Sequence, residues 1–465
     1  MNLLGIDVGT TSVKVALFNE DLEMLWSDTA EYTVESFGDR VEFPAERYVE
    51  IVKQEIENCP YEIGALAIDT QCETLILTDE KGVPTRKAIV WLDNRATKEA
   101  AEIEAKFGRK GVYEVTGQPE IIATWPAAKL MWVKKNEGDV WAKTKKVFLL
   151  EDYLLYCLTG EFVTEKTLQS SSLYFDINKG EWWNEMLEFI GLDSKMLPTL
   201  KNSGELVGVY NGIKVVTGAM DQVSGAIGAG VVEGGTVSVM TGTTMAILCP
   251  TNIIPEYDPE SIVPCHYNYN GEYCLLSWSP TAGMALKWFR DNFSEGFSFD
   301  ELGNLAEKVP AGCAGLTFLP YLCGSTMPKY NTEARASFTG VSAEHTRGHF
   351  VRSIMESVAF MLRENLEYLN LNVKEIRAMG GAANSKVWCQ IKSDVTGADL
   401  VTLKSKETAC LGGAILAGVG VGIFSSVEDK CKNIALKNRY TPSGEDYEKV
   451  YEAYKKYDAL LNVKG

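Results

Sequence analysis

Residues 3–18 have the sequence LLGIDVGTTSVKVALF, and this stretch determines how the rest of the chain is interpreted. An apolar run leads to Asp7, and apolar residues alternate again over 13–17, which predicts a β-hairpin. Its turn, residues 9–12, consists of one glycine and three hydroxyl side chains and is called the first tip below. Gly9 lets a ligand approach the backbone closely. Taken alone, the stretch fits a phosphate-binding turn and an ordinary Gly-Thr hairpin about equally well.

The residues around the first tip suit the phosphates of a nucleotide bound with Mg²⁺. Thr10, Thr11 and Ser12 offer hydroxyl groups beside turn amides, which are donors for phosphate oxygens. Lys14 adds a cation, and Asp7 places a carboxylate where a metal ion on those phosphates could lie. The hairpin therefore predicts a phosphate site, with a solvated acid as the alternative.

A second copy of this hairpin lies far downstream. Residues 236–248 have the sequence TVSVMTGTTMAIL, in which a β-rich run meets a Gly-Thr-Thr turn and a second apolar strand follows. This turn, residues 241–244, is called the second tip. Two such hairpins predict a duplicated fold. A glycine turn at 233–235 precedes the second copy, so we place the domain boundary there and expect domains 1–233 and 234–465.

The composition is typical of a globular protein with two or three domains: 465 residues, 46% hydrophobic and 23% charged. The formal net charge of −18 argues against a nucleic-acid partner, although a local site with Mg²⁺ can still bind ATP. The apolar runs are too short to cross a bilayer and no signal-like segment opens the chain, so we expect a cytoplasmic protein without a membrane partner. The 11 cysteines are scattered, which favours reduced, buried thiols over a metal site.

Polar residues follow several predicted strands, where α/β proteins usually bind ligands. A strand at 63–68 leads into the polar segment 69–74, and a strand at 88–92 leads into a charged loop and a helix at 97–107. A further strand at 215–219 ends before Asp221. These alternating elements indicate the α/β class.

Together, in this order, the motifs resemble the FGGY carbohydrate kinases, a family related to actin and the heat-shock ATPases. The two tips are similar to the family's phosphate hairpins, and the resemblance covers essentially the whole chain. Further matching segments are 124–136, in which Thr124 replaces the usual first residue of one family signature, 336–356, 380–382 and 407–417.

The resemblance implies two ribonuclease-H-like α/β domains that close over a central cleft. The sugar would bind mainly to the first domain and ATP mainly to the second. It also implies ATP and Mg²⁺ as cofactors and a small sugar or polyol as the binding partner. Family members are often dimers or tetramers, so the resemblance allows a homodimer.

Phosphoryl transfer to an alcohol requires a base near the hydroxyl group. The three histidines lie outside any acidic or glycine-rich cluster, so we expect a carboxylate in this role. Asp221, in the segment Gly218–Gln222, matches the family's catalytic aspartate, and its alternative role is that of a helix N-cap. Asp7 would hold Mg²⁺ through bound water and thereby complete the catalytic pair.

The resemblance also implies two sets of binding residues. ATP would meet both tips, a helix start and a glycine turn, that is, Thr10, Thr11, Ser12, Lys14, Gly242, Thr243, Gly283, Lys287, Gly380, Gly381, Ala382 and Asn384. Lys287 could equally be a solvated helix lysine. The sugar would meet Gln71, Cys72, Glu73, Trp91, Asp93, Trp125, Asp221 and Gln222. Asp93 and Arg95 could instead form a structural ion pair, and Trp125 could belong to the core.

The acceptor is the least determined part of the prediction. Glycerol kinases carry an arginine where this chain has Cys72, and xylulose kinases carry Met-His at residues 72–73. Residues 124–132 and 407–417 look closer to the xylulose kinase branch, so we expect a ketopentose such as D-xylulose. The alternative is glycerol or another polyol, for which Glu73 and Gln222 are suitable partners. A non-kinase ATPase of the actin type is disfavoured because it would not need the sugar-side residues.

Overall fold

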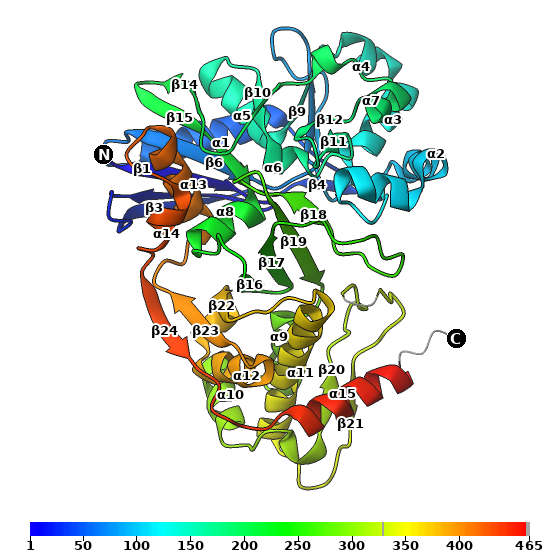
Figure 1. The fold of residues 1–465 in the computed structure, drawn as a ribbon, viewed down its shortest axis with the longest axis vertical. Helices are drawn as coiled ribbons and strands as arrows, with labels where there is room; N and C mark the ends of the chain where they lie inside the picture. The colour runs from blue at the N-terminus through cyan, green and yellow to red at the C-terminus, as the bar shows by residue number, and fades with distance from the viewer. Residues whose placement is uncertain (328–329, 462–465) are drawn as a thin grey trace.

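The computed structural model describes residues 1–327 and 330–461, which form two lobes, each built around a mixed β-sheet (Figure 1). The first sheet has the order β14-β15-β6-β1-β2-β3. The hairpin predicted at 3–18 is its β1–β2 pair, with Asp7 opposite Lys14. The strands are β1 (Leu3–Val8), β2 (Ser12–Phe18), β3 (Met24–Glu31), β6 (Ala65–Thr70), β14 (Leu206–Tyr210) and β15 (Ile213–Met220).

The second sheet repeats the design of the first. Its order is β18-β19-β17-β16-β22-β23-β24. In both sheets an antiparallel meander precedes two parallel strands and an antiparallel edge strand, so the predicted duplication is confirmed. The strands are β16 (Thr236–Thr241), β17 (Met245–Thr251), β18 (Cys265–Tyr267), β19 (Tyr273–Ser279), β22 (Glu375–Met379), β23 (Asp399–Leu403) and β24 (Leu436–Tyr440).

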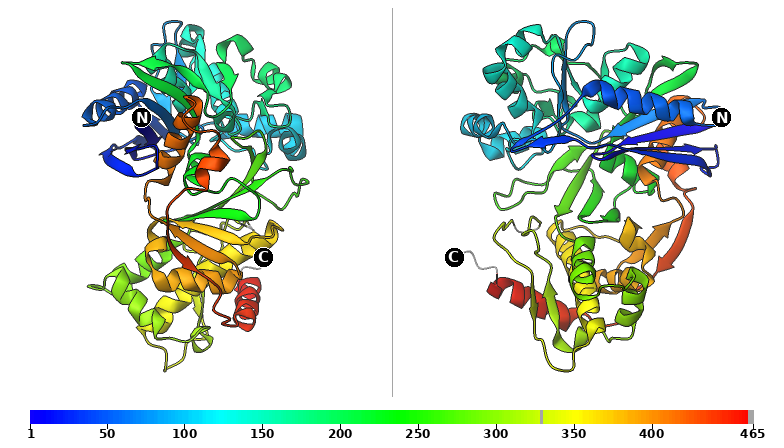
Figure 2. Two further views of the ribbon diagram at one scale, coloured as in Figure 1. Left: turned by 60° about the vertical axis from the view of Figure 1, so that its left-hand side comes forward. Right: turned by 180° about the vertical axis from the view of Figure 1, so that it is seen from behind.

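Helices cover both faces of the first sheet. On one face, α1 (Ala45–Asn58) and α5 (Leu150–Thr159) bury the side chains of Leu4 and Ile6. The other face is covered by α8 (Asp221–Gly228) and α13 (Thr408–Gly420) (Figure 2). These two helices pack against Leu3 and its neighbours. The hairpin strands are therefore buried on both faces, which explains their nearly continuous apolar sequence.

Helix α13 belongs to the second half of the sequence but packs on the sheet of the first lobe. Its backbone comes so close that a Cβ atom added at Gly5 would lie 1.7 Å from the carbonyl oxygen of Cys410. A Cβ atom at Gly412 would lie 1.9 Å from the carbonyl oxygen of Ser224 on α8. Small residues are required on both sides of this contact, which joins the second half of the sequence to the first lobe.

A third, smaller sheet carries the loops on the sugar side that the sequence predicts. It contains β4 (Glu35–Phe37), β5 (Arg40–Phe43), β7 (Leu75–Thr78), β8 (Ala88–Ile89) and β9 (Lys146–Leu149). The helix expected at 97–107 continues as α2 (Thr97–Thr116), interrupted at Gly108, whose φ of 69° is left-handed. Helix α3 (Pro126–Asn136) begins at its proline, as the sequence predicts.

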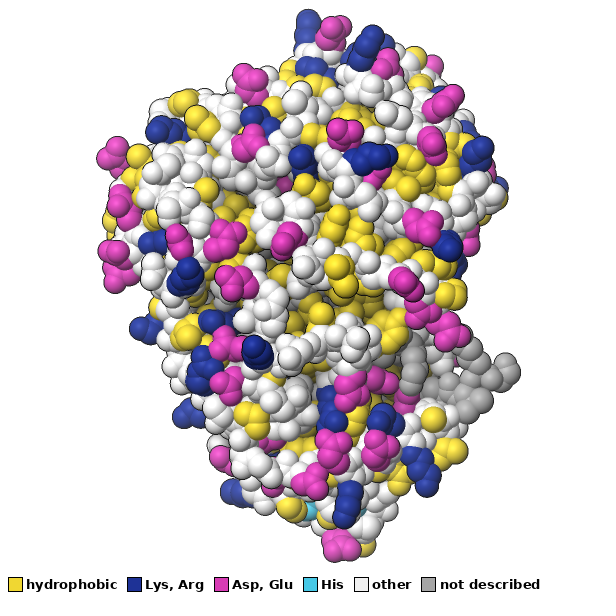
Figure 3. Space-filling model, in the orientation of Figure 1, with side chains coloured by type: hydrophobic (Ala, Val, Ile, Leu, Met, Phe, Trp, Pro, Cys, Tyr) yellow, Lys and Arg dark blue, Asp and Glu magenta, His cyan; other side chains and the backbone are white. Residues whose placement is uncertain are grey.

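The helices of the second lobe enclose a separate core. It lies between the second sheet and α9 (Gly283–Phe293), α11 (Arg347–Tyr368), α12 (Lys386–Thr396) and α15 (Glu448–Leu461). On the face shown in Figure 3, positive and negative side chains are interspersed, which gives no favourable surface for a nucleic-acid backbone there. Within 1–327 and 330–461, no helix has both the length and the apolar content needed to cross a bilayer.

Candidate active site

Three carboxylates meet where β1, β6 and β15 end. Strands β1 and β6 are parallel, with Asp7 opposite Asp69, and β15 ends at Met220 so that Asp221 opens α8. Burial, together with the charge of Asp7, raises the pKa of Asp221 to about 7. Burial also raises the pKa of Asp7 to about 6, against the opposing effect of Lys14. A carboxylate that titrates near neutrality is suited to accept a proton during turnover.

Asp69 is a member of this cluster that the sequence analysis did not select. Its side chain is fully buried, and Ser224 Oγ donates a hydrogen bond of 3.2 Å to Oδ2. Burial, and then the charges of Asp7 and Asp221, hold the pKa of Asp69 well above its usual range. The repeated Ile-Asp pair at 6–7 and 68–69 was the available signal, because parallel strands in register bring the two acids together.

The cluster fits a hydrated metal ion better than a bare one. Among the described residues, no group of three or more His, Cys, Asp or Glu side chains is arranged to hold a metal ion directly. Mg²⁺ commonly keeps several waters and takes one or two carboxylates plus substrate phosphates. The buried Oδ1 of Asp69 has no hydrogen-bond partner in the described structure, so acceptor capacity is available beside Asp7.

The first tip is a tight turn in which the backbone N–H of Gly9 donates to Ser12 O at 3.0 Å. Thr10 Oγ1 accepts a hydrogen bond of 2.9 Å from the indole N–H of Trp91. Lys14 lies opposite Asp7 in the hairpin, and its Nζ is 3.7 Å from a carboxylate oxygen of Glu407. The predicted phosphate-side residues therefore lie together next to the carboxylate cluster.

The second tip forms one wall of a cavity of about 550 Å³. It is completed by the start of α9, the start of α10 (Phe299–Glu307), the turn after β22, and side chains of α11 and α12. Seven residues predicted to bind ATP line this cavity: Gly242, Thr243, Gly283, Lys287, Gly381, Ala382 and Asn384. Its other lining residues include Leu286, Phe299, Met355 and Trp388, whose apolar surfaces suit a flat heterocycle.

Two glycines are needed for the backbone to close around this cavity. A Cβ atom at Gly283 would lie 2.3 Å from Gly242 O, and one at Gly380 would lie 2.7 Å from Thr241 O. Gly380 also has a left-handed φ of 80°. Lys287 lines the cavity, but its Nζ pairs with Asp291 at 2.5 Å and 62% of its side chain is exposed, so it also fits the solvated-lysine alternative.

In the loop where the sequence predicts sugar contacts, Glu73 lies at a strained turn after β6, with φ of 54°. Burial raises the pKa of Glu73, Lys129 opposes the increase and Asp221 adds to it, and the resulting pKa is about 7. The fully buried Lys129 of α3 donates 3.0 Å hydrogen bonds to the carbonyl oxygens of Glu73 and Val90. The sequence analysis also did not select Lys129, because nothing in the sequence distinguishes a buried lysine on a helix from an exposed one.

The structure places two of the predicted sugar contacts in the interior. Asp93 is fully buried and pairs with Arg95 at 2.7 Å, and its Oδ2 also accepts a hydrogen bond from the backbone N–H of Val41. The alternative of a structural ion pair is therefore confirmed. Trp125 is only 9% exposed, belongs to an apolar core and donates its indole N–H to Glu120 O at 2.9 Å.

The other predicted sugar contacts remain near Asp221. Gln71 and Cys72 directly precede Glu73, and Gln222 follows Asp221 at the start of α8. Burial, and then the charges of Glu73 and Asp221, hold the pKa of the Cys72 thiol well above its usual range. Cys72 is therefore a neutral thiol, in contrast to the arginine expected of a glycerol kinase.

The histidines have structural roles. Burial lowers the pKa of His266 to about 4, and its Nδ1 lies 3.1 Å from Ser170 Oγ. His345 and His349 accept hydrogen bonds from the backbone N–H groups of Ser342 and Thr346. These positions agree with the expectation that a carboxylate serves as the base.

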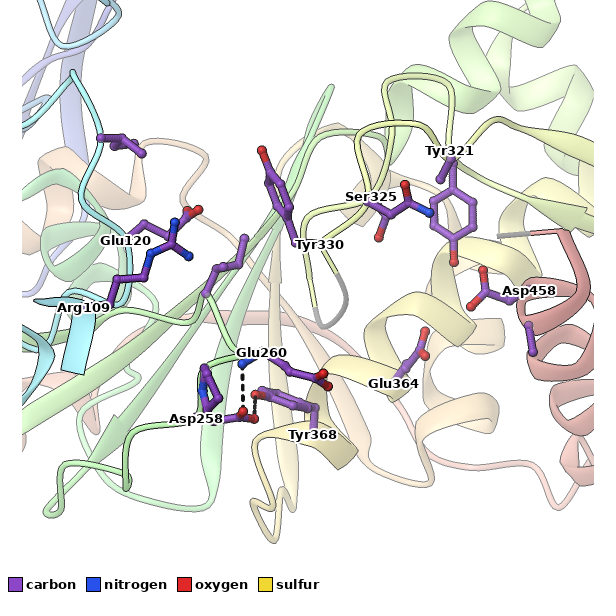
Figure 4. Close-up of a pocket in the computed structure, with 16 residues that line it drawn as sticks. Arg109, Glu120, Asp258, Glu260, Tyr321, Ser325, Tyr330, Glu364, Tyr368 and Asp458 are labelled. Carbon is purple, nitrogen blue, oxygen red and sulfur yellow. Dashed lines mark hydrogen bonds between the residues drawn. The ribbon is translucent and has the colours of Figure 1, made fainter. Parts of the chain in front are cut away.

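A larger cavity, of about 870 Å³, lies elsewhere between the lobes (Figure 4). Its lining includes five carboxylates and one guanidinium group: Glu120, Asp258, Glu260, Glu364, Asp458 and Arg109. Such a lining repels phosphate groups. The larger of these two cavities is therefore the less suitable one for a nucleotide.

Comparison with known proteins agrees with this geometry. Residues 2–230 match the N-terminal domain model of the FGGY family of carbohydrate kinases, and residues 238–421 match its C-terminal domain model. The chain is 27% identical to a xylulose kinase of Lactococcus lactis over 97% of its length and 95% of the relative's. It is 28% identical to a gluconokinase of Bacillus subtilis, with 99% and 94% of the two chains covered.

A solved structure gives the same result for the fold. The ligand-bound xylulose kinase of Lactobacillus acidophilus superposes with a TM-score of 0.91, at 22% identity, over 100% of this chain and 99% of the other. Both domain models match in the predicted order, and together they span most of the sequence. The chain therefore belongs to the FGGY family of carbohydrate kinases.

Proposed function

We propose that this carbohydrate kinase transfers the γ-phosphate of ATP to a hydroxyl group of a ketopentose such as D-xylulose. The supporting observation is the position of Asp221, whose carboxylate interacts electrostatically with Asp7 on the phosphate side and with Glu73 on the sugar side. The full-length similarity to a xylulose kinase favours a ketopentose as the acceptor.

In the proposed reaction, Asp221 accepts the proton of the acceptor hydroxyl. The hydroxyl oxygen forms a bond to the γ-phosphorus as the bond to the bridging oxygen breaks, and ADP leaves with that electron pair. Backbone and hydroxyl donors of both tips would surround the transferring group. Thr10, Thr11, Ser12 and Lys14 act from the first lobe, and Gly242 and Thr243 act from the second.

Adenosine would occupy the cavity of about 550 Å³ in the second lobe. Gly283, Gly380, Gly381 and Ala382 let a flat ligand lie against the backbone. Asn384 and Lys287 lie at its edge, where Lys287 contributes at most a solvent-screened charge.

Asp7 would hold Mg²⁺ through bound water, with Asp69 behind it. When bound, Mg²⁺ neutralises the charge that develops on the phosphates. Its positive charge would also favour the ionised forms of Asp7 and Asp221, which the buried site by itself disfavours.

For the acceptor, Gln71, Glu73 and Gln222 offer groups that pair with sugar hydroxyls, and Trp91 offers an aromatic face. Cys72 would contribute a neutral, half-buried thiol to the acceptor site. Glycerol or another polyol remains the alternative acceptor. The gluconokinase similarity adds a sugar acid to the candidates, although Glu73 and Asp221 in their ionised forms would repel a carboxylate.

A substrate series tests this proposal. ADP release is measured with Mg-ATP and each of D-xylulose, L-ribulose, glycerol, D-gluconate and no acceptor. We expect the highest kcat/KM for a ketopentose. A clear preference for glycerol or gluconate would overturn the acceptor, and equal hydrolysis with and without every acceptor would overturn the kinase assignment.

The remaining proposals concern the setting of the enzyme. We infer that it works in the cytoplasm on a small sugar and allow for a homodimer. Light scattering of the purified protein at several concentrations measures its oligomeric state, and a mass of one chain at all of them would exclude the dimer.

A further inference from the structure

The first tip is held from outside by Tyr32, which follows β3. The backbone N–H of Tyr32 donates to Thr11 O at 2.9 Å, and its phenolic O–H donates to Gly9 O. One residue therefore fixes the backbone at two points of the turn. Besides burial, the charge of Asp7 also acts on the Tyr32 phenol and contributes to its raised pKa.

Tyr32 is itself fixed by an aromatic cluster. Its ring centroid lies 4.9 Å from that of Phe43 and 5.5 Å from that of Tyr48, the latter edge-to-face. Burial raises the pKa of the Tyr32 phenol well above its usual value, so the hydroxyl remains a donor throughout the working pH range. A donor held in this way keeps its partner carbonyl in one position.

The same cluster reaches the loop on the sugar side. Gln71 Nε2 donates to the hydroxyl of Tyr48 at 3.3 Å, and the backbone N–H of Gln71 donates to Val8 O at 3.0 Å. The Oε1 atom of Gln71 is buried without a hydrogen-bond partner among the residues described. Contacts thus run from the loop after β6, through Tyr48 and Tyr32, to the first tip.

Trp91 also holds the tip. Its indole N–H donates to Thr10 Oγ1 at 2.9 Å, and its backbone N–H donates to Thr74 Oγ1 at 3.3 Å. Thr74 follows Glu73, so this second contact also begins in the sugar-side loop. Tyr32 holds backbone atoms of the tip, whereas Trp91 fixes the rotamer of one hydroxyl side chain.

We propose that Tyr32 and Trp91 are positioning residues that brace the first tip for the terminal phosphate of ATP. A turn made of glycine and small hydroxyl residues has many accessible conformations, and holding it in one of them before binding avoids an entropic cost during catalysis. The inference rests on the proposed role of the first tip in binding phosphate. It extends that role by naming the residues that keep the tip in place.

The test uses Tyr32→Phe, which removes one hydroxyl group and keeps the ring. Tyr156→Phe is the matched control, because Tyr156 is a half-buried tyrosine of the same lobe whose hydroxyl accepts a hydrogen bond of 2.9 Å from Lys146. Each deletion removes one hydrogen bond, so general destabilisation is similar in the two variants.

Calorimetry without acceptor compares the affinity for a nonhydrolysable ATP analogue with that for ADP. For Tyr32→Phe we expect the affinity for the analogue and kcat each to fall about fivefold to tenfold, the effect of one lost hydrogen bond. The affinity for ADP and the KM of the sugar should change by less than about twofold, since other groups supply most of that binding. Tyr156→Phe should leave all four quantities unchanged.

Trp91→Phe and the double variant complete the test. Because both residues brace one tip, the loss of analogue affinity in the double variant should be smaller than the product of the single losses. Equal results for Tyr32→Phe and Tyr156→Phe would overturn the brace even if the wild-type enzyme phosphorylates a sugar. Wild-type protein that shows no acceptor-dependent ADP release would instead overturn the proposed function.

Discussion

Replacing Asp221 by asparagine removes the charge of the proposed base while keeping its size and one acceptor oxygen. A positioned general base typically contributes about 10²–10⁴ to the rate, so we expect kcat to fall by at least about 100-fold. In the wild-type enzyme, turnover should rise with pH through the pKa of Asp221 and level off above it; this pKa is about 7 without metal, and bound Mg²⁺ would lower it. The asparagine variant should lose this dependence.

The same substitution should stabilise the protein at alkaline pH. The pKa of Asp221 rises from 3.8 to about 7 on folding, so the folded chain holds a proton that the unfolded chain releases. In the wild-type protein, the contribution of this bound proton to the free energy of unfolding is fully present below pH 4 and is lost as the pH increases through 7. At about 1.4 kcal/mol per pH unit, the loss amounts to at most about 4 kcal/mol. Partial access of solvent to Asp221 reduces the value.

Thermal unfolding at pH 5 and pH 8, together with initial rates at saturating substrate, measures both effects. Asp152→Asn is the matched control: this buried acid of the first lobe has a pKa raised to about 8 by burial, and it lies outside the site. It should gain stability at alkaline pH without losing activity. Near-normal turnover of Asp221→Asn would refute the base assignment, and an unchanged pH dependence of its stability would refute the raised pKa.

Three further predictions concern packing and position. Gly5→Ala should destabilise the fold by about 2 kcal/mol or more, because its Cβ would overlap Cys410 O. Gly138→Ala is the control, since open space surrounds Gly138 and the substitution should not destabilise the fold. Equal melting temperatures of the two variants would contradict the close contact of α13. Lys129→Met should raise the KM of the sugar more than that of ATP, because it removes the hydrogen bond to the Glu73 carbonyl oxygen. An effect confined to the KM of ATP would contradict a role of Lys129 in positioning Glu73. Asp93→Asn should destabilise the fold, but by less than the about 3–5 kcal/mol of a wholly unpaired buried charge, because Glu42 still pairs with Arg95 at 2.5 Å. The folded fraction should keep its KM for the sugar, and a large increase in that KM would favour Asp93 as a sugar contact.

Much of the fold could be predicted from local patterns. Both hairpins are short-range features, in which alternating apolar residues surround a Gly-Thr-Thr turn. The start of α3 at Pro126 was likewise predictable, because proline at the first helical turn is a local preference. The extension of α2 past Gly108 was not predictable. A glycine indicates the end of a helix, and the local sequence does not show whether a helix begins again after it.

The candidate site was predictable only in part, because its residues depend on contacts far apart in the chain. Asp93 and Trp125 lie next to suitable motifs, yet packing places both in the interior. Asp69 and Lys129 looked ordinary in the sequence, and they became candidates once strand register and helix packing placed them beside Asp7 and Glu73. Burial also sets the pKa values near 7, and it cannot be derived from residue type.

The sequence by itself determined that this protein has two related α/β halves, each opening on a hairpin with a Gly-Thr-Thr tip, and that it resembles sugar kinases. These properties depend on local periodicity and on motifs that can be recognised in the linear sequence. Only the tertiary structure decided that α13 crosses to the first lobe, that Asp7, Asp69 and Asp221 share one site, and that Tyr32 and Trp91 hold the first tip. The physical reason is that parallel strand register and close backbone packing join residues separated by tens to hundreds of positions, and no local pattern encodes those distances.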